Sequence, residues 1–149
     1  MVKVWLRTPT PRFERPDGAG ISTEAVRHAD AAAFVALKAL AMKYRHEPKD
    51  VADLVHVLRN YEGAPASIAE QYAARLTAGE YAEPLQLALA TLEEKFCTDP
   101  HTAGYLKDGP GRYVQFHEIT GAETRTLELR QVSGLLTEFV QLVRARVGR

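Results

Sequence analysis

Cysteine is almost absent from this sequence, which has one such residue, Cys97, among 149. A single cysteine excludes an internal disulfide and the zinc modules that bind their metal through several cysteines. A surplus of one charge is absent as well, because 19 lysines and arginines balance 19 aspartates and glutamates. The chain therefore has no overall attraction to nucleic acid or acidic membranes, and a polyanion site would have to be local. Cys97 itself is expected to be a small core residue.

Long hydrophobic runs are also missing. No segment offers the roughly 18 uncharged apolar residues of a membrane span, and the opening stretch MVKVWLRTPTPRFERP lacks the apolar run of a signal peptide. These features predict a cytoplasmic protein that does not interact with membranes. No pair of histidines has the spacing of a zinc-binding helix, and no glycine-rich phosphate loop or nucleophile elbow is found. The sequence therefore predicts no metal site.

What the sequence does have is the composition of a folded protein, with 46% hydrophobic and 26% charged residues. The pattern predicts a mainly α fold, with about five to six helices and one or two short strands at the N-terminus. Residues 1–29 are expected to form those strands and a loop rich in proline and glycine, and residues 30–149 a helical domain. The strands are expected over Val2–Leu6 and, more weakly, over Ile21–His28, with a loop over 8–20.

Helical patterning begins at Asp30, which is expected to cap a mostly apolar helix that ends near Arg45. Pro48 suits the first turn of a second helix, which Gly63 is expected to stop. Because the connection is short, these two helices should form an antiparallel hairpin. The remaining helices are expected over about 65–77, 81–96, a short segment from 110, and 123–147, with a loop over 98–111.

The hairpin gathers the charged residues that invite a functional interpretation. Lys38 lies in a helix that is otherwise apolar, where a lysine is costly unless it reaches solvent, pairs with a carboxylate or binds an anion. Arg45 follows two turns later, so both cations project from nearly the same face. The second helix opens with Lys49, Asp50 and Asp53 in the segment PKDVADL. Lys38 and Asp53 are therefore expected to face each other across the hairpin.

These charges admit two interpretations. In the first, Asp50 or Asp53 holds Lys38 or Arg45, so that the four residues form a structural ion-pair network that pins the two helices together, and the chain is a non-catalytic helical interaction module. In the second, the cations receive the phosphates of a ligand. Physical reasoning alone favours the structural interpretation.

The second interpretation comes from a resemblance. The stretch FVALKALAMKYRHEPKDVADLVHVLRNY is similar to the C-terminal signature of the AbiEii/AbiGii-type nucleotidyltransferase toxins, in which a helix lysine and a later arginine precede K-D-x-x-D-Leu. The matching positions are Lys38, Arg45, Lys49, Asp50, Asp53 and Leu54. The resemblance extends over about residues 26–147, through LATLEEKF, GPGRYVQF and the last helix. It implies that the helical domain is the C-terminal part of a nucleotidyltransferase-like fold and that residues 1–29 are a remnant of its sheet.

The resemblance also implies roles and partners. Lys38 and Asp53 would be catalytic, Lys38, Arg45 and Lys49 would contact the nucleotide phosphates, and Asp50 would support them. A nucleoside triphosphate and Mg²⁺ would be needed, and RNA or a protein would accept the nucleotide. An antitoxin, or a separately encoded N-terminal half, would be the partner.

One feature of the family has no counterpart in this sequence. Members carry a Gly-Ser or Gly-Gly turn, followed by a strand with an Asp-x-Asp or Asp-x-Glu pair that holds magnesium. Such carboxylates fix the metal that neutralises the triphosphate. Gly20, Ser22 and Asp30 are the nearest imitation, and Asp30 is better explained as a helix cap. The sequence therefore predicts a nucleotidyltransferase-like protein of toxin-antitoxin or phage-defence type that is inactive alone.

Overall fold

The structure, a computed structural model, describes residues 6–7, 12–14, 21–23 and 28–148. In this part of the chain the protein is mainly helical, as the sequence predicts. Six α-helices follow four short strands: α1 (Ala31–Tyr44), α2 (Pro48–Asn60), α3 (Ala66–Ala78), α4 (Ala82–Phe96), α5 (Asp108–Phe116) and α6 (Ala122–Val147). A 3-10 helix, η1 (Gly104–Leu106), precedes α5. Among the described helices, none has the length and apolar character that crossing a membrane would require.

The strands form two separate antiparallel pairs. The first joins β1 (Leu6–Arg7) to β4 (His28–Ala29), and the second joins β2 (Arg12–Glu14) to β3 (Ile21–Thr23). Of the predicted strand over Val2–Leu6, only Leu6 lies within the described residues. The loop predicted over 8–20 is wrong at β2, where three residues pair with β3. Prolines flank β2 in the sequence without interrupting it, and proline is tolerated at strand ends.

Helix boundaries follow the predicted caps closely. The Asp30 carboxylate accepts a hydrogen bond from the backbone N–H of Ala33 at 2.9 Å, which confirms it as the N-cap of α1. Asp30 also pairs with Arg75 of α3, so the cap is tied to a second helix. The second helix ends at Asn60, earlier than the Gly63 expected to stop it. The predicted loop over 98–111 contains η1 and the first turn of α5.

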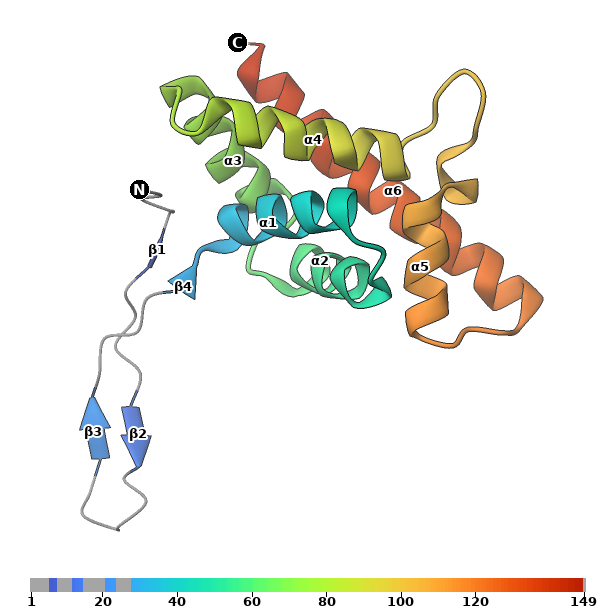
Figure 1. Cartoon of the computed structure of the whole chain (residues 1–149), viewed down its shortest axis with the longest axis horizontal. Helices are drawn as coiled ribbons and strands as arrows, with labels where there is room; N and C mark the ends of the chain where they lie inside the picture. The colour runs from blue at the N-terminus through green and yellow to red at the C-terminus, as the bar shows by residue number, and fades with distance from the viewer. Residues whose placement is uncertain (1–5, 8–11, 15–20, 24–27, 149) are drawn as a thin grey trace.

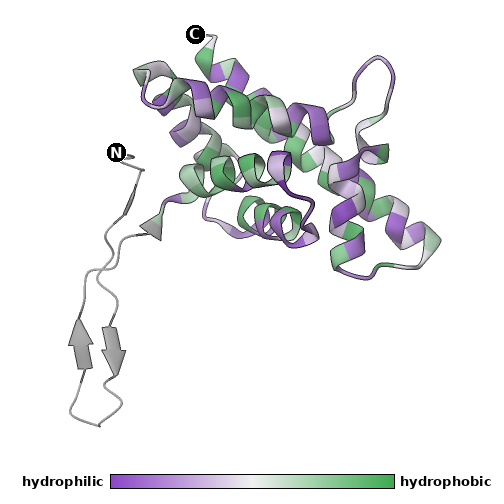
Figure 2. Ribbon diagram, in the orientation of Figure 1, coloured by the Kyte–Doolittle hydropathy of each residue, from purple (hydrophilic) through white to green (hydrophobic). Residues whose placement is uncertain are grey.

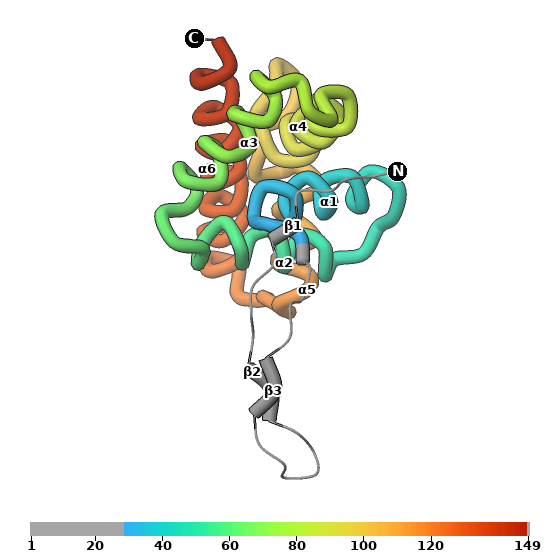
Figure 3. Tube along the Cα trace, turned by 90° about the vertical axis from the view of Figure 1, so that its left-hand side faces the viewer, coloured from blue at the N-terminus to red at the C-terminus, as the bar shows by residue number. Residues whose placement is uncertain are grey.

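Helices α1 and α2 form the predicted antiparallel hairpin, with α2 drawn directly below α1 (Figure 1). The long α6 runs along one side of the molecule, which the rotated view shows most clearly (Figure 3). It packs on α3, α4 and α5 and so connects both ends of the helical array. α5 in turn lies against α2, which places it beside the charged hairpin.

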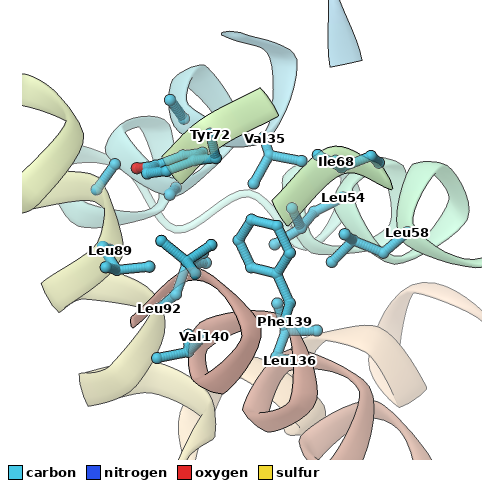
Figure 4. Packing of buried hydrophobic residues seen from close by; sticks show 14 of the residues in the cluster. Val35, Leu54, Leu58, Ile68, Tyr72, Leu89, Leu92, Leu136, Phe139 and Val140 are labelled. Carbon is cyan, nitrogen blue, oxygen red and sulfur yellow. The ribbon is translucent and has the colours of Figure 1, made fainter. Parts of the chain in front are cut away.

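The core lies where α1, α2, α3, α4 and α6 meet (Figure 4). Tyr72 and Phe139 are fully buried and meet edge to face, with ring centroids 5.8 Å apart. The Tyr72 hydroxyl donates to the backbone carbonyl of Leu85 at 2.6 Å, so its burial leaves no unpaired hydroxyl. Burial raises the pKa of this phenol far above its usual value.

Helix α1 is hydrophobic over most of its length, and one face of it is buried as expected (Figure 2). The opposite face is not, because Leu37 is 50% exposed and Tyr44 is 74% exposed. Cys97, predicted to be a core residue, is half-buried at the end of α4 and packs against the core.

Candidate functional site

The hairpin places Lys38 between two carboxylates of α2. Its ammonium nitrogen donates to Asp50 Oδ1 at 2.9 Å and to Asp53 Oδ2 at 2.7 Å. Asp50 and Asp53 share one face of α2 because residues three apart in a helix are neighbours. The expectation that Lys38 and Asp53 face each other is confirmed.

Two further cations complete the network. Arg45, which ends α1, donates from Nε to Asp50 Oδ2 at 2.7 Å and from Nη2 to Asp50 Oδ1 at 2.8 Å. Lys49 donates to Asp53 Oδ2 at 2.9 Å across one turn of α2. Each carboxylate therefore binds Lys38 and one other cation. Leu54, the last position of the signature, is fully buried in the core.

Burial in this charge network decreases outward. The Asp50 side chain is 2% exposed and Lys38 is 18% exposed, whereas Arg45 is 59% and Lys49 is 67% exposed. Asp50 is thus the buried centre, and the outer cations face solvent. Three cations surround two carboxylates, so the network carries one excess positive charge at neutral pH.

The hydrogen bonds shift the protonation of these groups. The Arg45 guanidinium is the main cause of a lowered pKa at Asp50, where burial acts in the opposite direction and Lys38 adds to the lowering. At Asp53, burial opposes ionisation, but hydrogen bonds from Lys38 and Lys49 outweigh it and lower the pKa. Burial likewise opposes the charge on Lys38, yet its bonds to Asp53 and Asp50 leave the pKa raised. All of these groups are charged at neutral pH.

Hydrogen-bonding capacity is left over at two atoms. An ammonium has three N–H donors, and within the described residues Lys38 uses two of them. Asp53 receives both of its bonds on Oδ2, so its Oδ1 has no partner in the described part of the chain. Lys38 can therefore donate once to an anion, and Asp53 can accept once more.

The network does not fit a magnesium ion. Mg²⁺ binds through carboxylate oxygens in a nearly octahedral shell, and here Asp50 is engaged on both oxygens by cations. Asp53 offers one oxygen beside two ammonium groups. Among the residues that the structure describes, no group of three or more histidine, cysteine, aspartate or glutamate side chains could hold a metal ion. These side chains can bind an anion but do not form a divalent-cation site.

Arg112 of α5 is a residue that the sequence reasoning missed. It is 7% exposed and donates to the backbone carbonyl of Arg45 at 3.5 Å. Its guanidinium also contacts His46 Nδ1 and pairs with Asp108 one turn earlier. Because arginine only donates, His46 Nδ1 is the acceptor. Arg112 thus holds the turn from which Arg45 projects, although nothing in GPGRYVQF distinguishes it from a surface arginine.

A cavity of about 250 Å³ opens between α2 and α5, on the side of the network marked by Asp53. Two of its lining residues, Ala52 and Val55, are apolar and buried. Its other lining residues are polar or aromatic: Asp53, His56, Arg59, Asn60, Tyr113, Phe116 and His117. Sequence reasoning missed this cavity because its two walls lie far apart in the chain.

Comparison with known proteins adds no assignment, since the chain matches no protein-family model, no curated protein and no solved structure. The resemblance to the AbiEii/AbiGii signature remains a prediction from the sequence.

Proposed function

We propose that this chain is the helical part of a nucleotidyltransferase-like protein of toxin-antitoxin or phage-defence type. The observation that supports the proposal is the convergence of the signature residues. Lys38, from the middle of α1, meets Asp50 and Asp53 of α2 within hydrogen-bond distance, and Arg45 and Lys49 join them. The network also leaves the cations of Arg45 and Lys49 exposed, and one Lys38 N–H has no acceptor among the described residues.

In this proposal, Lys38 orients and neutralises a phosphate, with Arg45 and Lys49 as outer contacts. Asp50 holds Lys38 and Arg45 in position, and Asp53 keeps the lysine charged while presenting Oδ1. Nucleotidyl transfer also requires metal-binding carboxylates, which this network does not supply. They would come from a partner that carries the Asp-x-Asp strand. The acceptor would be RNA or a protein.

A labelled nucleoside triphosphate tests the proposal. The purified chain, with each of the four nucleoside triphosphates and either Mg²⁺ or Mn²⁺, is expected to incorporate no label. Addition of a separately encoded fragment that carries the Gly-Ser turn and Asp-x-Asp strand is expected to restore transfer. In the restored system Lys38→Ala should abolish transfer. Lys43→Ala is the matched control, since Lys43 lies on the same helix, is exposed and takes no part in the network.

Two outcomes would contradict the proposal. Transfer by the purified chain alone would show that the residues present suffice. Restored transfer that is unchanged by Lys38→Ala would make the lysine structural.

A second candidate is the non-catalytic helical interaction module, and a separate feature favours it. A groove of about 690 Å³ runs between α1 and α4. Its lining is largely apolar: Leu40, Tyr44, Pro84, Leu87 and Ala90, with Glu83 and Gln86. Exposed apolar surface of this kind is typical of a protein contact. In this case Leu87→Arg should abolish partner binding, whereas Lys38→Ala should leave it unchanged.

A further inference from the structure

The cavity between α2 and α5 has walls suited to a flat ring. Tyr113 and His117 lie with their ring centroids 4.5 Å apart, and Phe116 meets His117 edge to face at 5.1 Å. Phe116 is 44% exposed although it is a large apolar ring, so an aromatic surface remains open to solvent. A ligand with a π face could cover this surface, since stacking on aromatic side chains tolerates many planar rings.

The same cavity presents polar atoms with unused hydrogen-bonding capacity. The Tyr113 hydroxyl accepts a bond from Arg59 at 2.8 Å, but its own hydrogen has no acceptor among the described residues. Tyr113 is only 9% exposed, so an unmade bond at this hydroxyl is costly. Asn60 donates to the backbone carbonyl of His56, and its Oδ1 has no partner in the part of the chain described. Asp53 Oδ1 is a second such acceptor, and the lining also includes the side-chain nitrogens of Arg59, His56 and His117.

The size of the cavity limits which ligands it could hold. At about 250 Å³ it is smaller than the roughly 300–1,000 Å³ of pockets that enclose drug-sized ligands. One ring system fits that space. An apolar ring would leave the polar atoms unpaired, and a simple anion would leave the exposed Phe116 ring uncovered. The lining therefore favours a planar heteroaromatic ring with both donor and acceptor groups on its edge.

We propose that this cavity binds the base of a nucleoside. The choice of a nucleobase among heteroaromatic rings rests on the proposed function, whereas the ring site itself rests on the cavity. Asp53 connects the two, because this residue lines the cavity and its carboxylate binds Lys38 and Lys49. A nucleotide whose base stacks beside Phe116 would then have cations at the Asp53 end of the cavity. Asn60 and the Tyr113 hydroxyl would form hydrogen bonds with the edge of the base.

Titration of the isolated chain with nucleosides tests this site. Adenosine, guanosine, cytidine and uridine lack phosphate, so they report the base site without the cations. Amide shifts in 15N-labelled protein should map at least one of them to α2 and α5. Ribose 5-phosphate, which lacks a base, should leave the amides of the α5 wall, Tyr113, Phe116 and His117, unshifted.

Variants separate the ring site from nonspecific stacking. Phe116→Ala should weaken nucleoside binding about 5-fold or more, which is the lower end of what loss of a stacking aromatic costs. Asn60→Ala should change the preference among the four bases. Tyr44→Ala is the matched control, because it removes an exposed aromatic ring that does not line this cavity, and binding should be unchanged.

The results also distinguish this inference from the proposed function. If no nucleoside shifts the cavity amides, or if Phe116→Ala and Tyr44→Ala weaken binding equally, the base site is wrong. Restored transfer that depends on Lys38 would then still support the proposed function. If a nucleoside binds in the cavity and complemented transfer is never obtained, the base site stands and the nucleotidyltransferase proposal fails.

Discussion

Lys38 and Asp53 lie on different helices, and their side chains are joined by a 2.7 Å hydrogen bond. Lys38 also donates to Asp50 at 2.9 Å, and the Asp50 side chain is almost fully buried. Removing a cation from this network and removing an anion from it have different consequences, however. Asp50 and Asp53 each retain a second cation when Lys38 is removed, whereas Lys38 and Arg45 share Asp50 as a common anion.

Loss of Lys38 should therefore be tolerated by the fold. In Lys38→Ala, Arg45 still holds Asp50 by two bonds, and Asp53 is exposed enough to be hydrated. We expect the free energy of unfolding to fall by about 2 kcal/mol, within the range for hydrogen bonds to charged groups. Urea denaturation followed by circular dichroism measures this change. A chain that is unfolded in water would instead make Lys38 a structural residue.

Loss of Asp50 should be more damaging, and its effect should depend on pH. Asp50→Asn leaves Lys38 and Arg45 without their shared charge, and breaking a buried pair in this way costs about 3 kcal/mol. The pKa of Asp50 is lowered in the folded state, so its carboxylate stabilises the fold above the unfolded value of 3.8. That stabilisation is lost as the pH falls through the folded pKa. The pKa of Asp53 is also lowered in the folded state, so its carboxylate contributes stability that is lost in the same way as the pH falls.

The unfolding free energy of the wild type should thus decline steeply below about pH 4, where unfolded aspartates begin to bind protons. In Asp50→Asn the decline should be shallower. Denaturation at pH 7, 5 and 3 compares the two proteins. Parallel curves for wild type and variant would show that the Asp50 carboxylate contributes nothing in its charged form.

Two glycines should respond to alanine in opposite directions. A Cβ at Gly104 would collide with the carbonyl of Phe96 and with the Ser133 hydroxyl, which itself donates to that carbonyl at 2.7 Å. Gly104→Ala should destabilise the protein by about 1–3 kcal/mol, the range for an overpacked core. Gly134 lies inside α6, with no atom within 4 Å of the added Cβ. Gly134→Ala should stabilise by about 0.5–1 kcal/mol, because alanine is the better helix former. Thermal unfolding of both variants measures the two effects. Melting temperatures that shift in the same direction for both variants would contradict this prediction.

The helices were predictable because their signals are local. Asp30 caps α1 and Pro48 starts α2, and both act on the backbone within one turn. The short connection then fixed the hairpin, which brought Lys38 to Asp50 and Asp53. The strand β2 was missed because three residues between prolines carry too little pattern, and pairing with β3 is what defines them.

The rest of the candidate site could not be read from the sequence for a different reason. The cavity has one wall from α2 and another from α5, and their contact depends on how α6 positions α5. Arg112 likewise reaches a turn that lies 67 residues earlier in the chain. The sequence pattern of a short helix indicates which residues are apolar, but it does not identify the neighbour that its arginine will meet.

Arg112 should prove to be the residue that orders the turn between α1 and α2. It is almost fully buried, and it joins the Arg45 carbonyl, His46 and Asp108. Arg112→Ala removes these bonds together and leaves the carbonyl and His46 Nδ1 to water, so we expect faster amide exchange at residues 45–47. Asp108 is 47% exposed, and Asp108→Asn should leave the turn protected because the Arg112 guanidinium still reaches its other two partners. Hydrogen exchange measured by mass spectrometry compares the two variants with the wild type.

Since the Arg45 side chain projects from this turn onto Asp50, Arg112→Ala should also flatten the difference in acid sensitivity between wild type and Asp50→Asn. If Asp108→Asn loosens the turn as much as Arg112→Ala does, the pair within α5 is what matters, and Arg112 does not order the turn.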